Sequence, residues 1–106
     1  MLNEKKYMEL LDITDAYSRK EPIITYWSNG LAAKCLPIFG INETSVDEDD
    51  EEFVGHYYMW LKISEIIQYG DDDSVDMDNG IIEINLKNIP EKITLENGTV
   101  IWKNNY

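Results

Sequence analysis

The dipeptide Asn29-Gly30, which lies between two apolar runs, is the feature that most restricts how this chain can fold. A two-residue type I′ turn needs positive φ at both central positions, and Asn-Gly adopts those angles readily. The dipeptide therefore predicts an antiparallel hairpin in which Ile24 pairs with Cys35. In that register Cys35 lies in the core, while Trp27 and Thr25 lie on the solvent face.

Three later segments also predict strands. Residues 53–69, "FVGHYYMWLKISEIIQY", alternate along the chain and are rich in aromatic and β-branched residues. Residues 81–86 and 92–102 follow, and Asn97-Gly98 predicts a second two-residue hairpin within the last of them. The predicted pairs of that hairpin are Leu95 with Val100 and Ile93 with Trp102.

Residues 3–18 precede these strands and predict a helix, because their apolar side chains recur at helical spacing on one face. The predicted apolar stripe consists of Tyr7, Leu10, Leu11 and Tyr17. Proline disfavours helical angles in the residue before it, so the helix is expected to end before Pro22.

Together these elements predict one α+β domain over residues 1–106. An N-terminal helix precedes a five- or six-stranded antiparallel sheet that is curled or closed into a small barrel. The order of helix and Asn-Gly hairpin resembles small barrels of the Sm or SH3 type. This resemblance implies a barrel geometry, and no function is carried over from it.

The negative charge of the chain is concentrated in two stretches. The net charge is −12, with seven Asp and Glu between residues 43 and 52 and five more between residues 71 and 78. Neither stretch contains Lys or Arg, and the other nine acids are matched by nine basic residues. The remainder of the chain is therefore neutral, and the whole surplus lies in the two acidic segments.

This distribution of charge excludes several classes of partner and location. Direct binding to nucleic acid or to an anionic membrane is disfavoured, because both need clustered Lys and Arg. Charged residues interrupt the first 17 residues, which therefore do not resemble a signal peptide, and no later run of about 18 apolar residues predicts a membrane span. We expect a cytoplasmic protein, in which the lone Cys35 forms no internal disulfide.

Catalysis is not expected. The chain has one histidine, His56, and one cysteine, Cys35. The predicted strands place Cys35 on a core face and His56 on an outer face, so the two are not expected to form a nucleophilic pair. Glycine-rich phosphate loops and the nucleophile-elbow pattern are absent from the sequence. The sequence therefore predicts neither an enzyme nor a cofactor.

A specific metal site is not expected either. Residues 71–80, "DDDSVDMDNG", are rich in the oxygen ligands that Ca²⁺ prefers. The EF-hand pattern fails, however, because Val75 and Met77 fall at ligand positions and Leu86 replaces the bidentate glutamate. Any binding of Ca²⁺ here is expected to be weak and unspecific.

The two acidic segments flank a strand whose predicted outer face carries aromatic residues. Aromatic anchors with an acidic rim suit an interface with a basic protein, because aromatics supply buried area and acids supply electrostatic steering. The candidate partner-binding residues are Asp47, Glu48, Asp49, Asp50, Glu51, Glu52, Asp71, Asp72, Asp73, Tyr58, Trp60 and Trp27.

We therefore favour the hypothesis of an immunity protein or antitoxin that masks the basic active site of a nuclease-type toxin. One alternative is a phage-type DNA mimic that inhibits a host defence enzyme of the restriction or CRISPR kind. Another is a domain whose acidic loops only increase solubility. The expected partner is thus a basic protein, and the sequence specifies no oligomeric state.

Overall fold

The computed structural model of the chain describes residues 4–53 and 55–104. Within them, one helix, α1 (Glu4–Ser18), precedes eight strands, and all strand pairs are antiparallel. The strands are β1 (Ile23–Tyr26), β2 (Ala32–Pro37), β3 (Asn42–Glu43), β4 (Tyr57–Gln68), β5 (Met77–Asp78), β6 (Ile81–Ile84), β7 (Lys92–Leu95) and β8 (Val100–Lys103).

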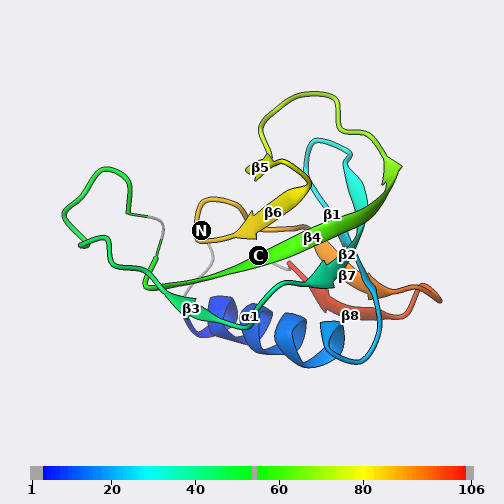
Figure 1. The fold of residues 1–106 in the computed structure, drawn as a ribbon, viewed down its shortest axis with the longest axis horizontal. Helices are drawn as coiled ribbons and strands as arrows, with labels where there is room; N and C mark the ends of the chain where they lie inside the picture. Colours follow the sequence, from blue (N-terminus) through cyan, green and yellow to red (C-terminus); the bar gives the residue numbers. More distant parts are fainter. Residues whose placement is uncertain (1–3, 54, 105–106) are drawn as a thin grey trace.

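The strands form a curled sheet in the order β5-β6-β4-β2-β1-β7-β8, and β3 pairs with the first residues of β4 (Figure 1). The predicted α+β fold with a curled antiparallel sheet is confirmed. The sheet is not closed over the described residues, because β5 and β8 form its two ends, so the barrel geometry is wrong. The sheet has two strands more than the six expected. The additional strands are β3 and β5, which have two residues each and lie beside the acidic segments.

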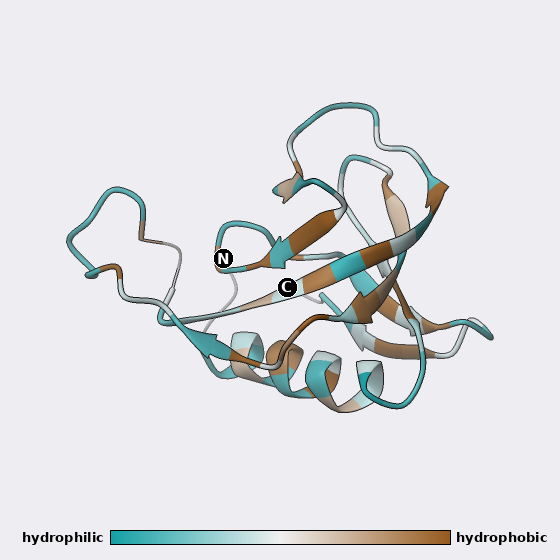
Figure 2. Cartoon of the chain, viewed as in Figure 1, coloured by the Kyte–Doolittle hydropathy of each residue, from teal (hydrophilic) through white to brown (hydrophobic). Residues whose placement is uncertain are grey.

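The core lies between α1 and the inner face of the sheet, and β4 runs through the middle of the molecule. Apolar and hydrophilic residues alternate along β4, as Figure 2 shows. Met59 and Leu61 are fully buried, whereas Trp60 and Lys62 between and after them are exposed. Other buried members of the core are Tyr7, Leu10, Leu11, Ile23, Ala33, Cys35, Ile82, Ile84 and Ile93.

Helix α1 packs against the sheet through the predicted apolar stripe, apart from Tyr17, the last residue of that stripe. Tyr17 is 39% exposed, so its predicted place in the core is wrong. Thr14 and Ser18 are buried instead, because they continue the spacing of three to four residues that begins at Tyr7. Thr14 satisfies its hydroxyl by donating to the carbonyl of Leu10 at 2.7 Å. No helix in the described part of the chain is long and apolar enough to cross a membrane.

The hairpin at Asn29-Gly30 forms, but its loop is longer than predicted. The amide of Gly30 donates to the carbonyl of Trp27 at 3.0 Å, and the amide of Trp27 donates to the carbonyl of Leu31 at 2.9 Å. Gly30 has a φ of 94°, whereas Asn29 is not among the residues of positive φ. This geometry is a three-residue loop with a glycine bulge, not the two-residue type I′ turn.

The longer loop shifts the strand register by one residue and exchanges the two faces of β1. Cys35 pairs with Ile23 instead of Ile24, and Thr25 is fully buried. Trp27 is only 4% exposed, and its Nε1 donates to Thr25 Oγ1 at 2.9 Å. The prediction that Trp27 and Thr25 lie on the solvent face is therefore wrong, because a one-residue slip turns every side chain over.

The hairpin at Asn97-Gly98 has the same kind of loop. Gly98 has a φ of 91°, and its amide donates to the carbonyl of Leu95 at 3.0 Å. The predicted pair of Ile93 with Trp102 is confirmed. The predicted pair of Leu95 with Val100 is wrong, because a register shift after Ile93 places Val100 opposite Thr94.

The type I′ turn occurs instead at Asn79-Gly80, directly after the second acidic segment. Both residues have positive φ, 52° and 77°, as a two-residue hairpin loop requires. This turn pairs Asp78 with Ile81 and Met77 with Ile82, so β5 and β6 form a short hairpin at one end of the sheet. The hairpin places β5 beside β6, which itself pairs with β4.

Candidate partner-binding surface

The outer face of β4 carries a cluster of three aromatic side chains, Phe39, Tyr58 and Trp60, which we call the aromatic strip. The ring of Phe39 lies 5.5 Å from that of Trp60 and 6.5 Å from that of Tyr58, and Tyr58 and Trp60 are 6.2 Å apart. These centroid distances are typical of interacting aromatic rings. Trp60 remains 37% exposed, so the strip is accessible to a partner.

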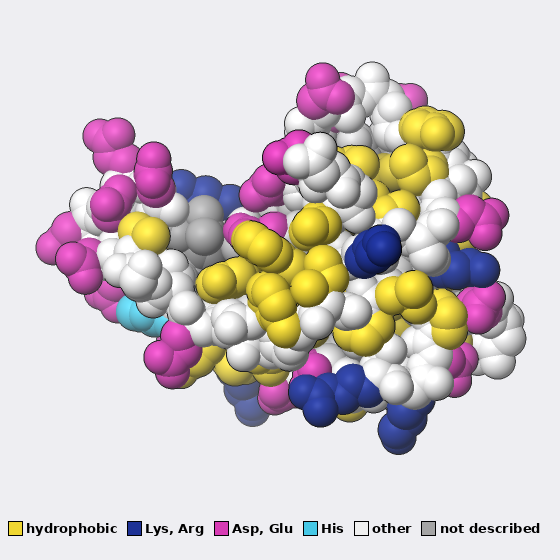
Figure 3. Space-filling model, in the orientation of Figure 1, with side chains coloured by type: hydrophobic (Ala, Val, Ile, Leu, Met, Phe, Trp, Pro, Cys, Tyr) yellow, Lys and Arg dark blue, Asp and Glu magenta, His cyan; other side chains and the backbone are white. Residues whose placement is uncertain are grey.

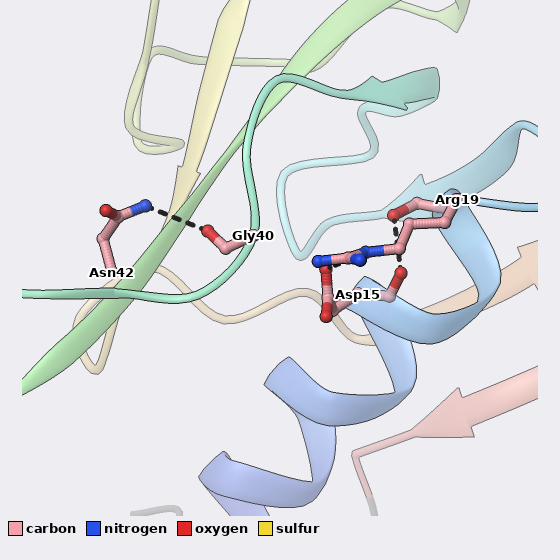
Figure 4. A network of polar contacts seen from close by, with 5 residues as sticks. Asp15, Arg19, Gly40 and Asn42 are labelled. Atoms are coloured by element: carbon pink, nitrogen blue, oxygen red, sulfur yellow. Dashed lines mark hydrogen bonds and ion pairs between the residues drawn. The ribbon is translucent and has the colours of Figure 1, made fainter.

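Phe39 joins the strip because the chain between β2 and β3 is seated on α1. Gly40 lies against the ion pair that Arg19 Nε forms with Asp15 Oδ1 at 2.9 Å, as Figure 4 shows. Asn42 Nδ2 donates to the carbonyl of Gly40 at 3.0 Å and closes the turn. No local pattern in the sequence indicated the position of Phe39, because it depends on the contact of residue 40 with the helix.

Glu83 on β6 lies directly opposite Trp60 on β4. Trp60 Nε1 donates to Glu83 Oε1 at 2.6 Å, and Asn85 Nδ2 donates to Glu83 Oε2. These two donors hold the carboxylate and the indole in a fixed mutual orientation. The sequence did not indicate Glu83, since its place beside Trp60 depends on the register between two strands that are distant in sequence.

Two hollows flank Trp60 and share Glu83 in their walls. The first, which we call the β5 pocket, has a volume of about 200 Å³. It is lined by Trp60, Asp76, Asp78, Asn79, Ile81 and Glu83. The second, the β3 pocket, has a volume of about 300 Å³ and lies between the strip and residues 43–46. Carboxylates therefore border the strip on both sides.

The first acidic loop, residues 44–56, projects from the beginning of β4 (Figure 1). Its two ends are joined by the amide of Thr44, which donates to the carbonyl of His56 at 2.7 Å. Successive turns follow, in which Asp50 donates to the carbonyl of Asp47 and Phe53 to that of Asp50. The predicted acids Asp47, Glu48, Asp49, Asp50, Glu51 and Glu52 are all exposed on this loop.

The second acidic loop, residues 69–76, is tied to the body of the domain. Asn29 Nδ2 donates to the carbonyl of Asp72 at 2.9 Å, and Val75 is buried in the core. Hydrogen bonds from Ser74 hold the pKa of the Asp72 carboxyl below its ordinary value. The predicted acids Asp71, Asp72 and Asp73 are exposed.

The two acidic loops flank one face of the molecule. Figure 3 shows hydrophobic side chains gathered at the centre of this face and acidic side chains on the two projecting parts beside it. The pockets themselves, however, are lined by acids outside the predicted set, namely Glu43, Asp76, Asp78 and Glu83. Of the predicted aromatic anchors, Tyr58 and Trp60 lie on this face and the buried Trp27 does not.

The structure does not bring Cys35 and His56 together. Cys35 Sγ lies 3.6 Å from Thr25 Oγ1 in the core, and burial raises the pKa of its thiol to about 11. His56 is exposed, and its Nε2 lies 2.7 Å from Glu48 Oε1. Among the described residues, no group of three or more His, Cys, Asp or Glu side chains is arranged to hold a metal ion.

Comparison with known proteins identifies the family of the chain. The family model described as "Cognate immunity protein YxxD" matches residues 5–106, which is nearly the whole chain. No curated protein and no solved structure matches the chain. Because the match spans the helix and every strand, the chain belongs to the YxxD family of cognate immunity proteins.

Proposed function

We propose that this immunity protein inhibits its cognate toxin by covering a basic active site of the nuclease type. The aromatic strip would contact the centre of the site, and the two acidic loops would contact its rim. The carboxylates would occupy the positions that substrate phosphates take in the free toxin. In this proposal the protein acts in the cytoplasm by binding alone, without catalysis or a cofactor.

The observation that carries the proposal is the position of the uncompensated charge. The twelve acids of the two acidic segments equal the whole net charge of −12. An active site that binds nucleic acid presents clustered Lys and Arg to phosphates, so its field is opposite in sign to that of the two loops. Such complementarity raises the association rate and excludes partners of the wrong charge.

The anatomy of the surface also supports this proposal. Protein interfaces commonly have an aromatic centre that is desolvated on binding and a polar rim that remains wet. Here the rings of Tyr58 and Trp60 lie between acidic loops that begin at the two ends of β4. DNA mimicry is less favoured, because it needs carboxylates at regular phosphate-like spacing along one rigid element, whereas most acids here lie on loops.

The test is the association rate of the purified protein with the purified toxin domain against which it protects. Neutralising Asp71, Asp72 and Asp73 to Asn should slow association about tenfold at 50 mM salt. The matched control neutralises three exposed acids of α1, Glu4, Glu9 and Asp12, and should slow association less than about twofold. Both variants change the net charge by the same amount.

The salt dependence of toxin binding provides the result that would contradict the proposal. Association of the wild-type protein should become markedly slower between 50 and 500 mM salt, because ions screen the loops. If affinity changes less than about threefold over this range, the acidic loops do not recognise a basic site and the proposal fails.

A further inference from the structure

We infer that the β5 pocket receives a single arginine side chain of the cognate toxin, whose guanidinium group stacks on Trp60 and pairs with Glu83. This inference rests on the proposed function, because it names the group of the basic partner that the surface recognises. It concerns a site apart from the acids at residues 47–52 and 71–73, none of which lines this pocket, whereas Asp76 at the end of the second acidic loop does.

Trp60 provides the platform for such a group. Its indole is exposed to solvent although it is held on one side by Phe39, at a ring distance of 5.5 Å, and at its edge by Glu83. A platform fixed in this way loses little conformational entropy when a partner binds. Tryptophan is also the most favourable aromatic residue for a cation placed over its face.

Glu83 provides the counter-charge. Each of its carboxylate oxygens accepts one hydrogen bond, from Trp60 or from Asn85, and each can accept another. None of the ion pairs found among the described residues involves Glu83, Asp76 or Asp78. The described lining of the pocket thus holds three carboxylates and no Lys or Arg side chain.

The shape of the pocket favours one arginine over other cationic groups. A volume of about 200 Å³ is below the roughly 300–1,000 Å³ of small-molecule sites and suits a single side chain. A planar guanidinium can stack on the indole and at the same time present two parallel N–H groups to a carboxylate. A lysine ammonium is a strongly hydrated point charge, which can pair with the carboxylate but has neither a planar face to stack nor two parallel N–H groups.

The pocket and the loops would then act on different rate constants. Exposed charges on the loops steer the partner and control the association rate, whereas a charge pair buried on binding controls dissociation. Glu83 is already half-buried, and a toxin seated on the strip would exclude water from it. This difference makes the inference testable independently of the loops.

The experiment measures dissociation of the toxin domain from the variant Glu83→Gln, which keeps the shape of the side chain and removes its charge. Dissociation should become about 10- to 100-fold faster, with the association rate changed less than about threefold. The matched control is Glu91→Gln, an equal change of charge at an exposed residue before β7, which should leave dissociation unchanged. Thermal unfolding of both variants verifies that they are folded.

A double-mutant cycle identifies the arginine. Each Arg of the toxin's basic surface is changed to Lys and measured against wild-type protein and against Glu83→Gln. One Arg→Lys change should accelerate dissociation at least about tenfold with the wild type and have little further effect with Glu83→Gln. Trp60→Leu should show the same coupling, since it removes the platform and leaves the carboxylate.

Two results would overturn the inference. One is an unchanged dissociation rate in Glu83→Gln, and the other is the absence of coupling with any Arg of the toxin. If this happens while neutralised loops still slow association, the pocket inference fails and the proposed function stands. If loop neutralisation and salt have no effect, the proposed function fails whatever the behaviour of Glu83.

Discussion

The backbone of Gly70 lies directly against the side-chain amide of Asn29, so that a β-carbon at position 70 would lie 2.4 Å from Asn29 Nδ2. The same amide donates to the carbonyl of Asp72, and the backbone amide of Asp71 donates to the carbonyl of Asn29 at 2.8 Å. Asn29 is itself buried and cannot easily move aside. The second acidic loop is thus held against the turn of the first hairpin.

Replacement of Gly70 by Ala should therefore destabilise the protein. The added methyl group would overlap Asn29 and force the loop away from the hairpin turn, at a cost of about 1–3 kcal/mol in the free energy of unfolding. Urea denaturation of the wild type and of Gly70→Ala measures this difference.

The double variant Asn29→Ala/Gly70→Ala is the control for this prediction, since removal of the Asn29 amide removes the overlap. It should be no less stable than Asn29→Ala alone. If Gly70→Ala costs the same free energy in both backgrounds, the contact with Asn29 is not the cause.

The sequence predicted the kinds of elements more successfully than their register. Asn-Gly located the hairpins at positions 29–30 and 97–98, because the dipeptide favours any loop that needs a positive φ. It could not distinguish a two-residue loop from a three-residue loop, since both place Gly in the left-handed region. The difference of one residue in loop length determines whether Trp27 is buried or exposed.

The candidate surface was predictable only in part for the same reason. The exposure of Trp60 followed from alternation along one strand, which is a local pattern. Glu83 and Phe39 reach the surface through pairing of β4 with β6 and through the contact of residue 40 with α1. Such contacts between distant segments are not encoded in any local spacing.

Substitution of Trp27 and of Trp60 by Phe, one at a time, should separate stability from binding. Trp27→Phe removes the hydrogen bond to the buried hydroxyl of Thr25 and leaves a cavity, so the free energy of unfolding should fall by about 1–3 kcal/mol. Trp60→Phe should lower it by less than Trp27→Phe does, because its hydrogen bond to Glu83 and its ring contacts lie at the surface.

The binding of the toxin domain should show the opposite order. Trp60→Phe should accelerate dissociation, and Trp27→Phe should leave it unchanged at temperatures where the variant is folded. Surface plasmon resonance with immobilised toxin domain measures both rates. Equal effects of the two substitutions on dissociation would contradict the assignment of Trp60 to the interface.

Tyr7 joins α1 to the beginning of β4 and should contribute to stability. Its hydroxyl donates to the carbonyl of Tyr57 at 2.6 Å, immediately before the aromatic strip. Tyr7→Phe should lower the free energy of unfolding by about 1–2 kcal/mol, because a carbonyl in a part-buried site loses its donor. Tyr17→Phe is the matched control and should have no measurable effect, since Tyr17 is exposed. Urea denaturation at neutral pH distinguishes the two.

The thiol of Cys35 should make the protein less stable in alkaline solution. Burial raises the pKa of this thiol from an ordinary value of 9.0 to about 11, while the unfolded chain keeps the ordinary value. Between these two values the unfolded state binds fewer protons than the folded state, so the free energy of unfolding decreases as the pH rises. Well below pH 9 the thiol is protonated in both states and contributes no pH dependence.

The loss due to the thiol should reach about 2–3 kcal/mol near pH 11, since one pKa unit corresponds to about 1.4 kcal/mol. Burial and the charge of Glu83 also raise the pKa of Tyr7, which adds a loss of the same sign. The contribution of the thiol is therefore the difference between the wild type and Cys35→Ala, measured by urea denaturation from pH 8 to pH 11. Cys35→Ala should lose less stability over this range, and parallel curves for the two proteins would show that the thiol does not ionise on unfolding.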